Sequence, residues 1–434
     1  MKFILLSGGS GKRLWPLSSD ARSKQFLKIL KNENGTYESM LQRVWGQLAH
    51  IGIISDVHIV ASASHIEIIK QQLGSDISVI IEPERRDTFP AISLSCLYLK
   101  DVLKIPEDEI ICVLPVDPYV ESEYFQNILE MERVLEASSA ELVLMGAQPT
   151  YPSGKYGYII PGVSDRDKRY FNVQSFFEKP SEQQAEKLIE ERALWNCGVF
   201  AFKLSYVLDI MREKKQPLSF SKLQQTYDQL EKISFDFAVV EEAQKVVAIS
   251  YNGYWKDLGT WNTITEEIQE NIIGRGTLSE DSRNTHIVNE LNIPVFVLNI
   301  SNAVIAVSHE GILVTDKPTS PRLKELMKDF KQITMYEERH WGTYRVLDHL
   351  LKDGKHTITK RVKVYANSTW CGKTSEKEIH IITVVSGVGI LSQSKILNEY
   401  GLGEVINIHP NQGYNFHSRT QDLEFILVQI FEIS

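Results

Sequence analysis

A glycine-rich loop near the N-terminus contains residue types that bind phosphate. An apolar run at residues 3–6 is followed by Ser7-Gly8-Gly9-Ser10-Gly11-Lys12-Arg13, and Lys24 lies a short distance further on. Glycines leave backbone N–H groups open to phosphate oxygens, and several nearby cations neutralise phosphate charge. This combination suits a triphosphate and its pyrophosphate leaving group. The three glycines alone also fit an ordinary turn, so the prediction depends on the cations.

The spacing of the loop excludes two commoner phosphate-binding motifs. A Walker loop requires GxxxxGK followed by Ser or Thr, but Arg13 follows Lys12, and Leu6 occupies the position of the first glycine. A dinucleotide fingerprint GxGxxG beginning at Gly9 would require glycine in place of Leu14. The sequence therefore predicts neither a Walker-type ATPase nor a hydride-transferring enzyme.

Two aspartates follow strand-like runs. Asp117 comes shortly after the apolar run at residues 110–113, and Asp257 lies in a loop after another predicted strand. Ligands of open α/β sheets gather at the carboxyl ends of strands, and carboxylate oxygens suit magnesium. Both aspartates are therefore candidates for contact with a ligand at that edge of the sheet. For each one alone, the alternative is a helix cap or a turn residue.

Glu82 lies at the end of an apolar run, and the family resemblance described below implies that it selects the nucleotide base. A carboxylate can accept hydrogen bonds from both the N1–H and the 2-amino group of guanine, a donor pair that adenine and uracil lack. Glu82 therefore favours a guanine nucleotide. The alternative is an exposed carboxylate at the end of a strand.

The elements that must position these residues alternate regularly. Short apolar runs and longer helix-like stretches follow one another to about residue 248, which predicts an α/β fold with a parallel sheet. Ser181 and Gln184 match a capping box, which predicts a helix running to about Leu194.

The pattern changes in the C-terminal part of the chain. We expect short strands at residues 295–300, 303–308 and 311–315, and an amphipathic helix at 321–332. From about residue 340, apolar runs separated by glycines predict a small β-barrel or jelly roll.

Composition narrows the class of protein further. The chain has 434 residues, with 47 Lys+Arg against 56 Asp+Glu, and this net charge of −9 disfavours nucleic acid as a partner. Its four cysteines form no CxxC pair, so we expect neither a disulfide framework nor a zinc ribbon. The N-terminal apolar run is too short for a signal peptide, and no stretch reaches the ~18–20 apolar residues that span a membrane. We expect a cytoplasmic protein without a membrane partner.

Several motifs occur in the order typical of one family. The chain contains GGSGKRLWPLS, KQFL, Glu82-Pro83 with Pro90-Ala91, VLPVD, PTYP with GYI, FEKP, LWNCG, Phe235-Asp236 and WKDLGTW. It resembles the sugar-1-phosphate nucleotidyltransferases, most closely the bacterial mannose-1-phosphate guanylyltransferases, also called GDP-mannose pyrophosphorylases. The resemblance is strong over residues 1–270 and weaker beyond. It implies a Rossmann-like α/β domain at 1–270 with a mixed, mostly parallel sheet, a short β-rich segment at 271–335 and a cupin-like β jelly roll at 336–434.

The resemblance also implies a reaction and a set of site residues. GTP and α-D-mannose 1-phosphate would give GDP-mannose and diphosphate by in-line attack on the α-phosphorus, with Mg²⁺ as cofactor, as a step toward polysaccharide biosynthesis. The implied catalytic residues are Arg13, Lys24, Asp117 and Asp257, of which Asp117 and Asp257 would hold the metal. The implied nucleotide-binding residues are Leu6, Gly8, Gly9, Gly11, Lys12, Arg13, Glu82 and Pro90. The implied sugar-phosphate residues are Gly157, Glu178, Lys179 and Asn196.

The sequence departs from the family pattern at positions that bear on the substrate. Lys12 stands where the family usually has Thr, Ser23 where it has Pro, Asp87 where it has Asn, Pro118 where it has His and Arg85 where it has Gly. None of these changes removes an implied catalytic group. The alternatives are the same chemistry on another sugar 1-phosphate, such as a manno-heptose, a catalytically silent nucleotide-sugar sensor, or an interaction scaffold.

The C-terminal part resembles the cupin domain that isomerises mannose 6-phosphate in longer bifunctional relatives. The histidine cluster expected there is missing, and His380 and His417 are the only plausible imidazole ligands. Catalytic metal sites commonly need three protein ligands. We therefore expect a metal-free domain with a structural or dimer-forming role, in a homodimer.

Overall fold

The computed structural model describes residues 1–9, 12–162, 169–330, 333–394 and 396–432. The chain divides into two compact units. The first consists of Met1–Ser10, Gln25–Ile66 and Leu73–Gly259, and the second of Gly11–Lys24, Glu67–Gln72 and Thr260–Ser434. Two short segments from the N-terminal part of the sequence therefore belong to the second unit. The predicted domains 1–270, 271–335 and 336–434 remain a proposal.

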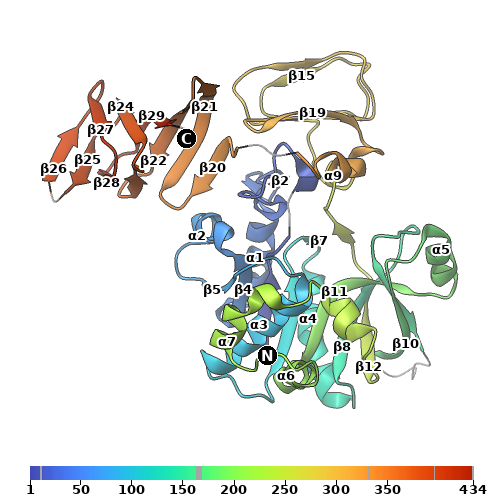
Figure 1. The fold of residues 1–434 in the computed structure, drawn as a ribbon. Helices are drawn as coiled ribbons and strands as arrows, with labels where there is room; N and C mark the ends of the chain where they lie inside the picture. The colour runs from blue at the N-terminus through green and yellow to red at the C-terminus, as the bar shows by residue number, and fades with distance from the viewer. Residues whose placement is uncertain (10–11, 163–168, 331–332, 395, 433–434) are drawn as a thin grey trace. The chain divides into compact units, whose positions relative to one another are not determined.

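Within the described residues, a nine-stranded sheet organises the first unit (Figure 1). The strand order is β5-β4-β1-β6-β11-β8-β12-β10-β9. In that order the strands span Ser78–Glu82, Val57–Ser62, Lys2–Leu6, Ile110–Pro115, Leu194–Lys203, Leu142–Ala147, Val246–Tyr251, Phe171–Glu178 and Gly157–Pro161. All of them except β10 and β11 run in one direction, so the sheet is mixed and mostly parallel, as predicted.

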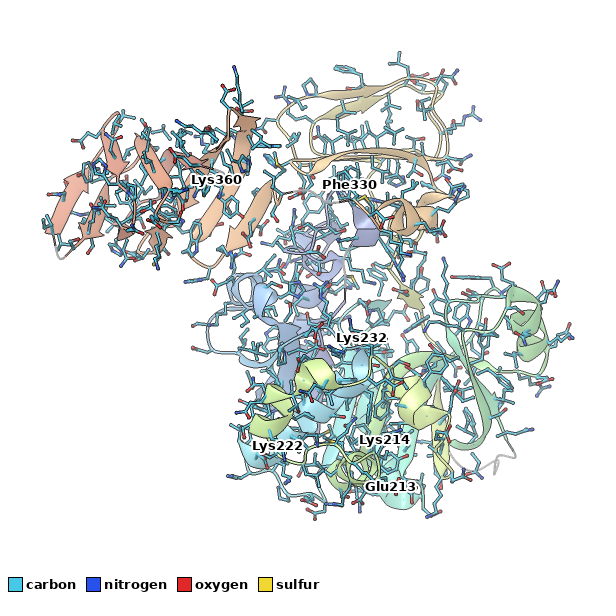
Figure 2. The ribbon with its side chains drawn as sticks, viewed as in Figure 1. Glu213, Lys214, Lys222, Lys232, Phe330 and Lys360 are labelled. Carbon is cyan, nitrogen blue, oxygen red and sulfur yellow. The ribbon has the colours of Figure 1, made fainter. Side chains whose placement is uncertain are left out.

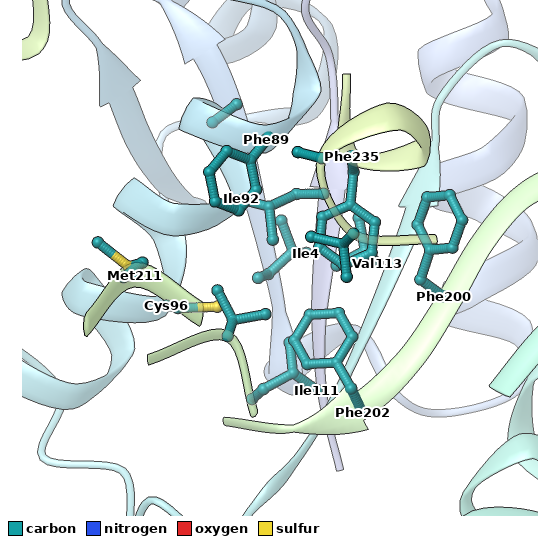
Figure 3. Packing of buried hydrophobic residues seen from close by; sticks show 14 of the residues in the cluster. Ile4, Phe89, Ile92, Cys96, Ile111, Val113, Phe200, Phe202, Met211 and Phe235 are labelled. Carbon is teal, nitrogen blue, oxygen red and sulfur yellow. The ribbon is translucent and has the colours of Figure 1, made fainter. Parts of the chain in front are cut away.

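Helices bury the sheet. α3 (Thr88–Asp101) is buried along most of its length and packs against α6 (Leu204–Glu213) and α7 (Phe220–Gln225). Figure 3 shows Phe89 of α3 in one cluster with Ile4 and Ile111 of the sheet. The remaining longer helices are α1 (Met40–His50), α2 (Ile66–Leu73, largely in the second unit), α4 (Glu123–Ala137) and α5 (Glu182–Glu190). Burial on both faces explains why the central strands are continuously apolar rather than alternating.

The chain also contains short strand pairs and helical turns. A two-stranded antiparallel ribbon joins β7 (Pro118–Val120) to β13 (Trp255–Asp257), and a second joins β2 (Leu30–Lys31) to β3 (Tyr37–Glu38). The short helical turns are η1 (Lys12–Leu14), η2 (Lys24–Phe26), η3 (Ile54–Asp56), η4 (Ala63–His65), η5 (Tyr227–Gln229), η6 (Asp236–Val240, a π-helix) and α8 (Trp261–Ile264).

Residues 272–316 of the second unit form several short, paired strands. β14 (Ile272–Ile273), β16 (His286–Asn289) and β18 (Ala303–Ser308) pair in parallel, and β19 (Gly311–Asp316) pairs with β18 antiparallel. β15 (Gly276–Leu278) and β17 (Val295–Val297) form a separate parallel pair. Apolar side chains including Ile287 and Ile305 fill the space between these strands. The β-rich segment predicted between the two larger parts is thus present.

Two further sheets of the second unit form the predicted jelly roll. One contains β20 (Tyr336–Arg339), β21 (Gly342–Lys352), β22 (Lys355–Val364), β29 (Leu423–Glu432), β24 (Glu378–Ser386) and β27 (Val405–Ile408). The other contains β23 (Thr369–Lys373), β28 (Gly413–Ser418), β25 (Gly389–Gln393) and β26 (Ile396–Tyr400). Phe425 of the first sheet and Phe416 of the second share one buried cluster, so the two sheets pack face to face.

Two predicted helices are shorter than expected. The capping box of α5 is confirmed, because the Ser181 hydroxyl accepts from the Gln184 N–H, but the helix ends at Glu190 rather than near Leu194. Leu194 instead begins β11 and pairs with β9. The helix expected at 321–332 is wrong in extent: of its described residues, up to 330, only those in η7 (Ser320–Arg322) and α9 (Leu323–Leu326) are helical, and residues 331 and 332 lie outside the described residues. Leu323 is buried and Leu326 is exposed, so packing supports only the first turn.

None of the helices formed by the described residues is both long and apolar enough to span a membrane.

Candidate functional site

Two cavities of the first unit meet at the carboxyl end of β6. The larger has a volume of about 470 Å³ and the smaller about 190 Å³. Pro115 and Asp117 line both cavities. Ligands of open α/β sheets bind at this end of the strands. Asp117 therefore lies where the two cavities meet.

The glycine loop forms part of the wall of the larger cavity. Leu6, Gly8 and Gly9 line it, and Gly9 has a φ of +116°, a conformation that glycine tolerates. The Ser7 N–H donates to the Val60 carbonyl at 2.9 Å, and Gln25 Nε2 donates to the Ser7 carbonyl at 3.0 Å. These bonds hold the loop at the end of β1. Gly11, also predicted here, lies outside the described residues.

Three predicted cations belong to the second unit. Lys12 and Arg13 begin η1, and Lys24 begins η2, within the segment Gly11–Lys24. Lys12 forms an ion pair with Asp20 at 3.0 Å. Gly9 and Gln25, close to the two ends of this segment, line the larger cavity. The contact of Lys12, Arg13 and Lys24 with phosphate stays a prediction.

Glu82 lies in the wall of the larger cavity, at the end of β5. It is only 5 % exposed, so it is not the exposed strand-end carboxylate that was the alternative. The Tyr227 hydroxyl donates to Glu82 Oε1 at 2.9 Å, and the Arg86 N–H donates to the same oxygen at 3.3 Å. Burial raises the pKa of the Glu82 carboxyl, while these two donors oppose the rise.

The N-terminus of α3 adjoins Glu82. Thr88 and Ala91 of its first turn line the larger cavity, as do Arg85 and Asp87 just before it. Pro90, predicted to bind nucleotide, is buried within this turn and is not among the residues that line the cavity. A contact between Pro90 and a nucleotide stays a prediction.

The two predicted metal ligands come together through the ribbon of β7 and β13. Its register pairs Asp257 with Pro118, the neighbour of Asp117, and both carboxylates line the smaller cavity. A Cβ at Gly259 would lie 3.1 Å from Asp257 Oδ2, so glycine there leaves the carboxylate room. Two carboxylates fit Mg²⁺, which usually takes one or two from protein and completes its shell with water and substrate phosphate. No group of three or more His, Cys, Asp or Glu side chains suited to a metal occurs in the described part of the chain.

The predicted sugar-phosphate residues surround the smaller cavity. Gly157, Glu178 and Asn196 line it. A Cβ at Gly157 would lie 2.6 Å from Glu178 Oε2, so the glycine is required for this packing. Lys179 is not among the lining residues; it adopts a φ of +47° and forms an ion pair with Glu178.

Sequence reasoning assigned no role to Asp236, which lies behind Asn196. Asn196 Nδ2 donates to Asp236 Oδ1 at 2.7 Å. Burial, together with the nearby charge of Glu178, raises the pKa of Asp236 to about 7. The Phe235-Asp236 pair stood among the family motifs, but its partner could not be read from the sequence. Asp236 fixes the amide of Asn196 at the wall of the smaller cavity.

Tyr227 and Lys232 were also missed. Lys232, labelled in Figure 2, lines the larger cavity. Tyr227 contacts that cavity only through Glu82, a residue 145 positions away in the sequence. Neither position carries a recognisable motif, and only the tertiary pairing reveals them.

The two candidate histidines of the jelly roll have separate partners. His380 Nδ1 is 2.6 Å from the Tyr414 hydroxyl, and Nε2 is 2.5 Å from Glu378 Oε1. His417 Nδ1 is 3.0 Å from Thr369 Oγ1. Both ring nitrogens of His380 thus take part in a buried polar network.

The fold and the cavities place a glycine loop and a pair of aspartates in the first unit of an α/β protein, around two cavities that share Asp117. Residues 2–272 match the family described as Nucleotidyl transferase, and the chain belongs to this family. The predicted α/β nucleotidyltransferase fold is thereby confirmed.

Relatives resemble the chain over nearly its whole length. A mannose-1-phosphate guanylyltransferase of Escherichia coli is 29 % identical, covering 91 % of each chain. The xanthan biosynthesis protein XanB of Xanthomonas campestris pv. campestris is 27 % identical over 90 % of this chain and 87 % of its own. A Thermus thermophilus structure titled mannose-1-phosphate geranyltransferase superposes with a TM-score of 0.64 at 26 % identity, covering 75 % of this chain and 98 % of the other.

Proposed function

We propose that the chain is a mannose-1-phosphate guanylyltransferase, which converts GTP and α-D-mannose 1-phosphate to GDP-mannose and diphosphate. Two relatives so named match 91 % and 98 % of it. The observation that carries the proposal is the position of Asp117, which lines both cavities and lies beside Asp257. The reaction requires a nucleotide and a sugar phosphate to meet at one phosphorus, and two cavities joined at a carboxylate suit that requirement.

The larger cavity would hold the nucleotide. Its glycine loop offers backbone N–H groups to the phosphates, and the N-terminus of α3 adds a favourable dipole. Arg13 and Lys24 are assigned to the triphosphate and to the charge that develops as diphosphate leaves. Glu82 would accept from the donor edge of guanine. Together, these contacts with the phosphates and the base would hold the α-phosphorus near Asp117.

The smaller cavity would hold the sugar phosphate. Glu178 and Asn196 would bind sugar hydroxyls, and Gly157 gives the ring room. Lys179 is assigned to the sugar phosphate, once it turns from its ion pair with Glu178. A phosphate oxygen held in this way would attack the α-phosphorus in line, so positioning replaces a protein nucleophile.

Asp117 and Asp257 would hold Mg²⁺ between the two substrates. When bound, the ion neutralises phosphate charge and lowers the barrier to attack. The two carboxylates would supply two of its oxygen ligands, and water and substrate phosphate the others. We also propose that the enzyme works in the cytoplasm as a homodimer.

Diphosphate release with magnesium tests this assignment. GTP, ATP, CTP, UTP and dTTP are each paired with mannose 1-phosphate, glucose 1-phosphate and a manno-heptose 1-phosphate. The expected result is rapid release with GTP and mannose 1-phosphate alone. Faster turnover of a different pair would move the substrate assignment, and silence with every pair, alongside measurable GDP-mannose binding, would indicate a sensor instead of an enzyme.

A further inference from the structure

The two oxygens of Glu82 have different surroundings. Oε1 accepts both the Tyr227 hydroxyl at 2.9 Å and the Arg86 N–H at 3.3 Å. Oε2 faces the glycine loop, since an ideal Cβ on Gly8 would lie 4.0 Å from it. Gly8 and Glu82 both line the larger cavity. One oxygen is thus held by the protein and the other is directed toward the space that a ligand would fill.

Tyr227 is itself firmly held. It is 1 % exposed and belongs to a segment, residues 227–235, that is bonded to the loop before α3 and to the start of that helix. Arg86 Nη1 donates to the Leu230 carbonyl at 2.8 Å, and the Phe235 N–H donates to Thr88 Oγ1 at 2.7 Å. Figure 3 shows the Phe89 and Phe235 rings in the same core cluster. The hydroxyl therefore has little freedom to follow a rotation of Glu82.

We propose that Tyr227 is a positioning residue for base selection: by holding Oε1 of Glu82 it presents Oε2 to the N1–H and 2-amino donors of guanine. This inference rests on the proposed guanylyltransferase function. Tyr227 lies behind Glu82 and is not itself among the residues that line the cavity.

The charge of Glu82 depends on the same contact. Burial favours the neutral acid, while the two donors on Oε1 favour the carboxylate. The other charged groups around it are Arg85, which favours the carboxylate, Asp87, which opposes it, and Lys232 on the cavity wall. Without the Tyr227 hydroxyl, a larger share of Glu82 would carry a proton. A protonated Glu82 cannot accept from guanine at that oxygen, and its O–H can donate to N1 of adenine.

The test compares the full chain with its Tyr227→Phe variant, using GTP and ATP with mannose 1-phosphate from pH 6 to pH 9. A matched control, Tyr206→Phe, removes a hydroxyl that packs against the same core cluster away from both cavities. Thermal unfolding shows whether each variant is folded.

The expected result for Tyr227→Phe is a KM for GTP raised about tenfold at neutral pH, the scale of one hydrogen bond to a charged group. The kcat should stay within about twofold because the groups at phosphorus are unchanged. The rise in KM for GTP should be larger at the low end of the pH range than at the high end, because loss of the hydroxyl donor raises the pKa of Glu82 further. The preference for GTP over ATP should fall. Tyr206→Phe should match the wild type.

Two results would overturn the inference. An unchanged GTP-to-ATP preference with an unchanged pH profile would show that Glu82 does not depend on Tyr227. Equal losses of kcat for both nucleotides at every pH would show a merely structural role. If the wild-type chain does not use GTP at all, both the proposed function and this inference are refuted. If the wild type is specific for GTP and the Tyr227→Phe variant behaves in the same way, only the role of Tyr227 is refuted.

Discussion

Arg22 and Glu290 are 268 positions apart in the sequence and form a two-point ion pair in the second unit. Arg22 Nη1 donates to Glu290 Oε2 at 3.0 Å, and Nη2 donates to Oε1 at 2.8 Å. The segment that contains Arg22 also carries Lys12, Arg13 and Lys24. Further bonds attach it to the same unit: the Ser308 hydroxyl donates to the Pro16 carbonyl at 2.5 Å, and Trp261 Nε1 donates to the Trp15 carbonyl at 3.1 Å. The C-terminal part of the chain thus holds the stretch that bears the proposed phosphate-binding cations.

The first prediction concerns this ion pair. Glu290→Gln leaves the buried Arg22 with Glu338, at 3.8 Å, as its remaining carboxylate partner in the described chain. We expect a loss of about 2 kcal/mol in unfolding free energy, below the upper range for a broken buried pair, because Glu290 is partly exposed. The KM for GTP should rise as the segment loosens. Chemical denaturation and steady-state kinetics measure the two effects.

A matched control for that prediction is Glu130→Gln on α4. Glu130 pairs with Arg133 on the surface, and such pairs contribute roughly 0–1 kcal/mol. An equal loss of stability in both variants would contradict the importance of the Arg22 pair.

The second prediction concerns the carboxylate pair. Asp117→Asn or Asp257→Asn should lower kcat by orders of magnitude, because each change removes a charged ligand from the proposed magnesium site. The melting temperature should change little, and the exposed Asp108→Asn should retain full activity. Activity is measured over a range of magnesium concentrations. Near-normal turnover in both variants would refute the metal assignment.

The third prediction follows from the pKa of Asp236, raised to about 7 by burial. The folded protein keeps this proton up to about pH 7, while the unfolded chain releases it near pH 4. The folded state therefore binds more protons in this window, and Asp236 makes stability fall as pH rises through it. Asp236→Asn removes that fall.

Melting temperatures of the two proteins between pH 4 and pH 8 measure the difference. The variant should gain stability relative to the wild type up to about pH 7 and show no further gain above it. A difference that stays constant with pH would show that Asp236 titrates as an ordinary carboxyl.

The fourth prediction concerns the wall of the smaller cavity. In Gly157→Ala the new Cβ would lie 2.6 Å from Glu178 Oε2 and 2.7 Å from Phe176 Cζ, so Glu178 must move. The KM for the sugar phosphate should rise, the KM for GTP should stay the same, and stability should fall by about 1–3 kcal/mol. Gly46→Ala in α1 is the control, because nothing lies within 4 Å of its Cβ and alanine favours a helix. An equal rise in both KM values would contradict a separate sugar cavity.

Much of the site could be predicted because its residues sit at strand ends that the sequence marks clearly. The glycine loop follows β1, Glu82 ends β5, and Asp117 follows β6, so each lies at the carboxyl edge of the sheet. The pairing of Asp257 beside Asp117 depends on the register of the ribbon of β7 and β13, which joins segments distant in sequence. The resemblance to a family supplied that pairing, whereas periodicity did not.

Contacts without a local pattern could not be predicted. Tyr227 reaches Glu82, and Asp236 reaches Asn196, only after the chain has folded. The prediction of a helix at 321–332 was wrong in extent for a different reason. The local amphipathic pattern was present, but no tertiary packing from the described residues covers Leu326, which remains exposed. Local pattern decides an element only where tertiary packing supports it.

The most direct test of the central claim is the fate of GTP labelled at the α-phosphorus, incubated with magnesium and mannose 1-phosphate. We predict that the label passes into GDP-mannose in step with diphosphate release, and that Asp117→Asn stops both. Release of diphosphate without labelled GDP-mannose, or full transfer by Asp117→Asn, would contradict the claim that the two cavities share one reaction centre at Asp117.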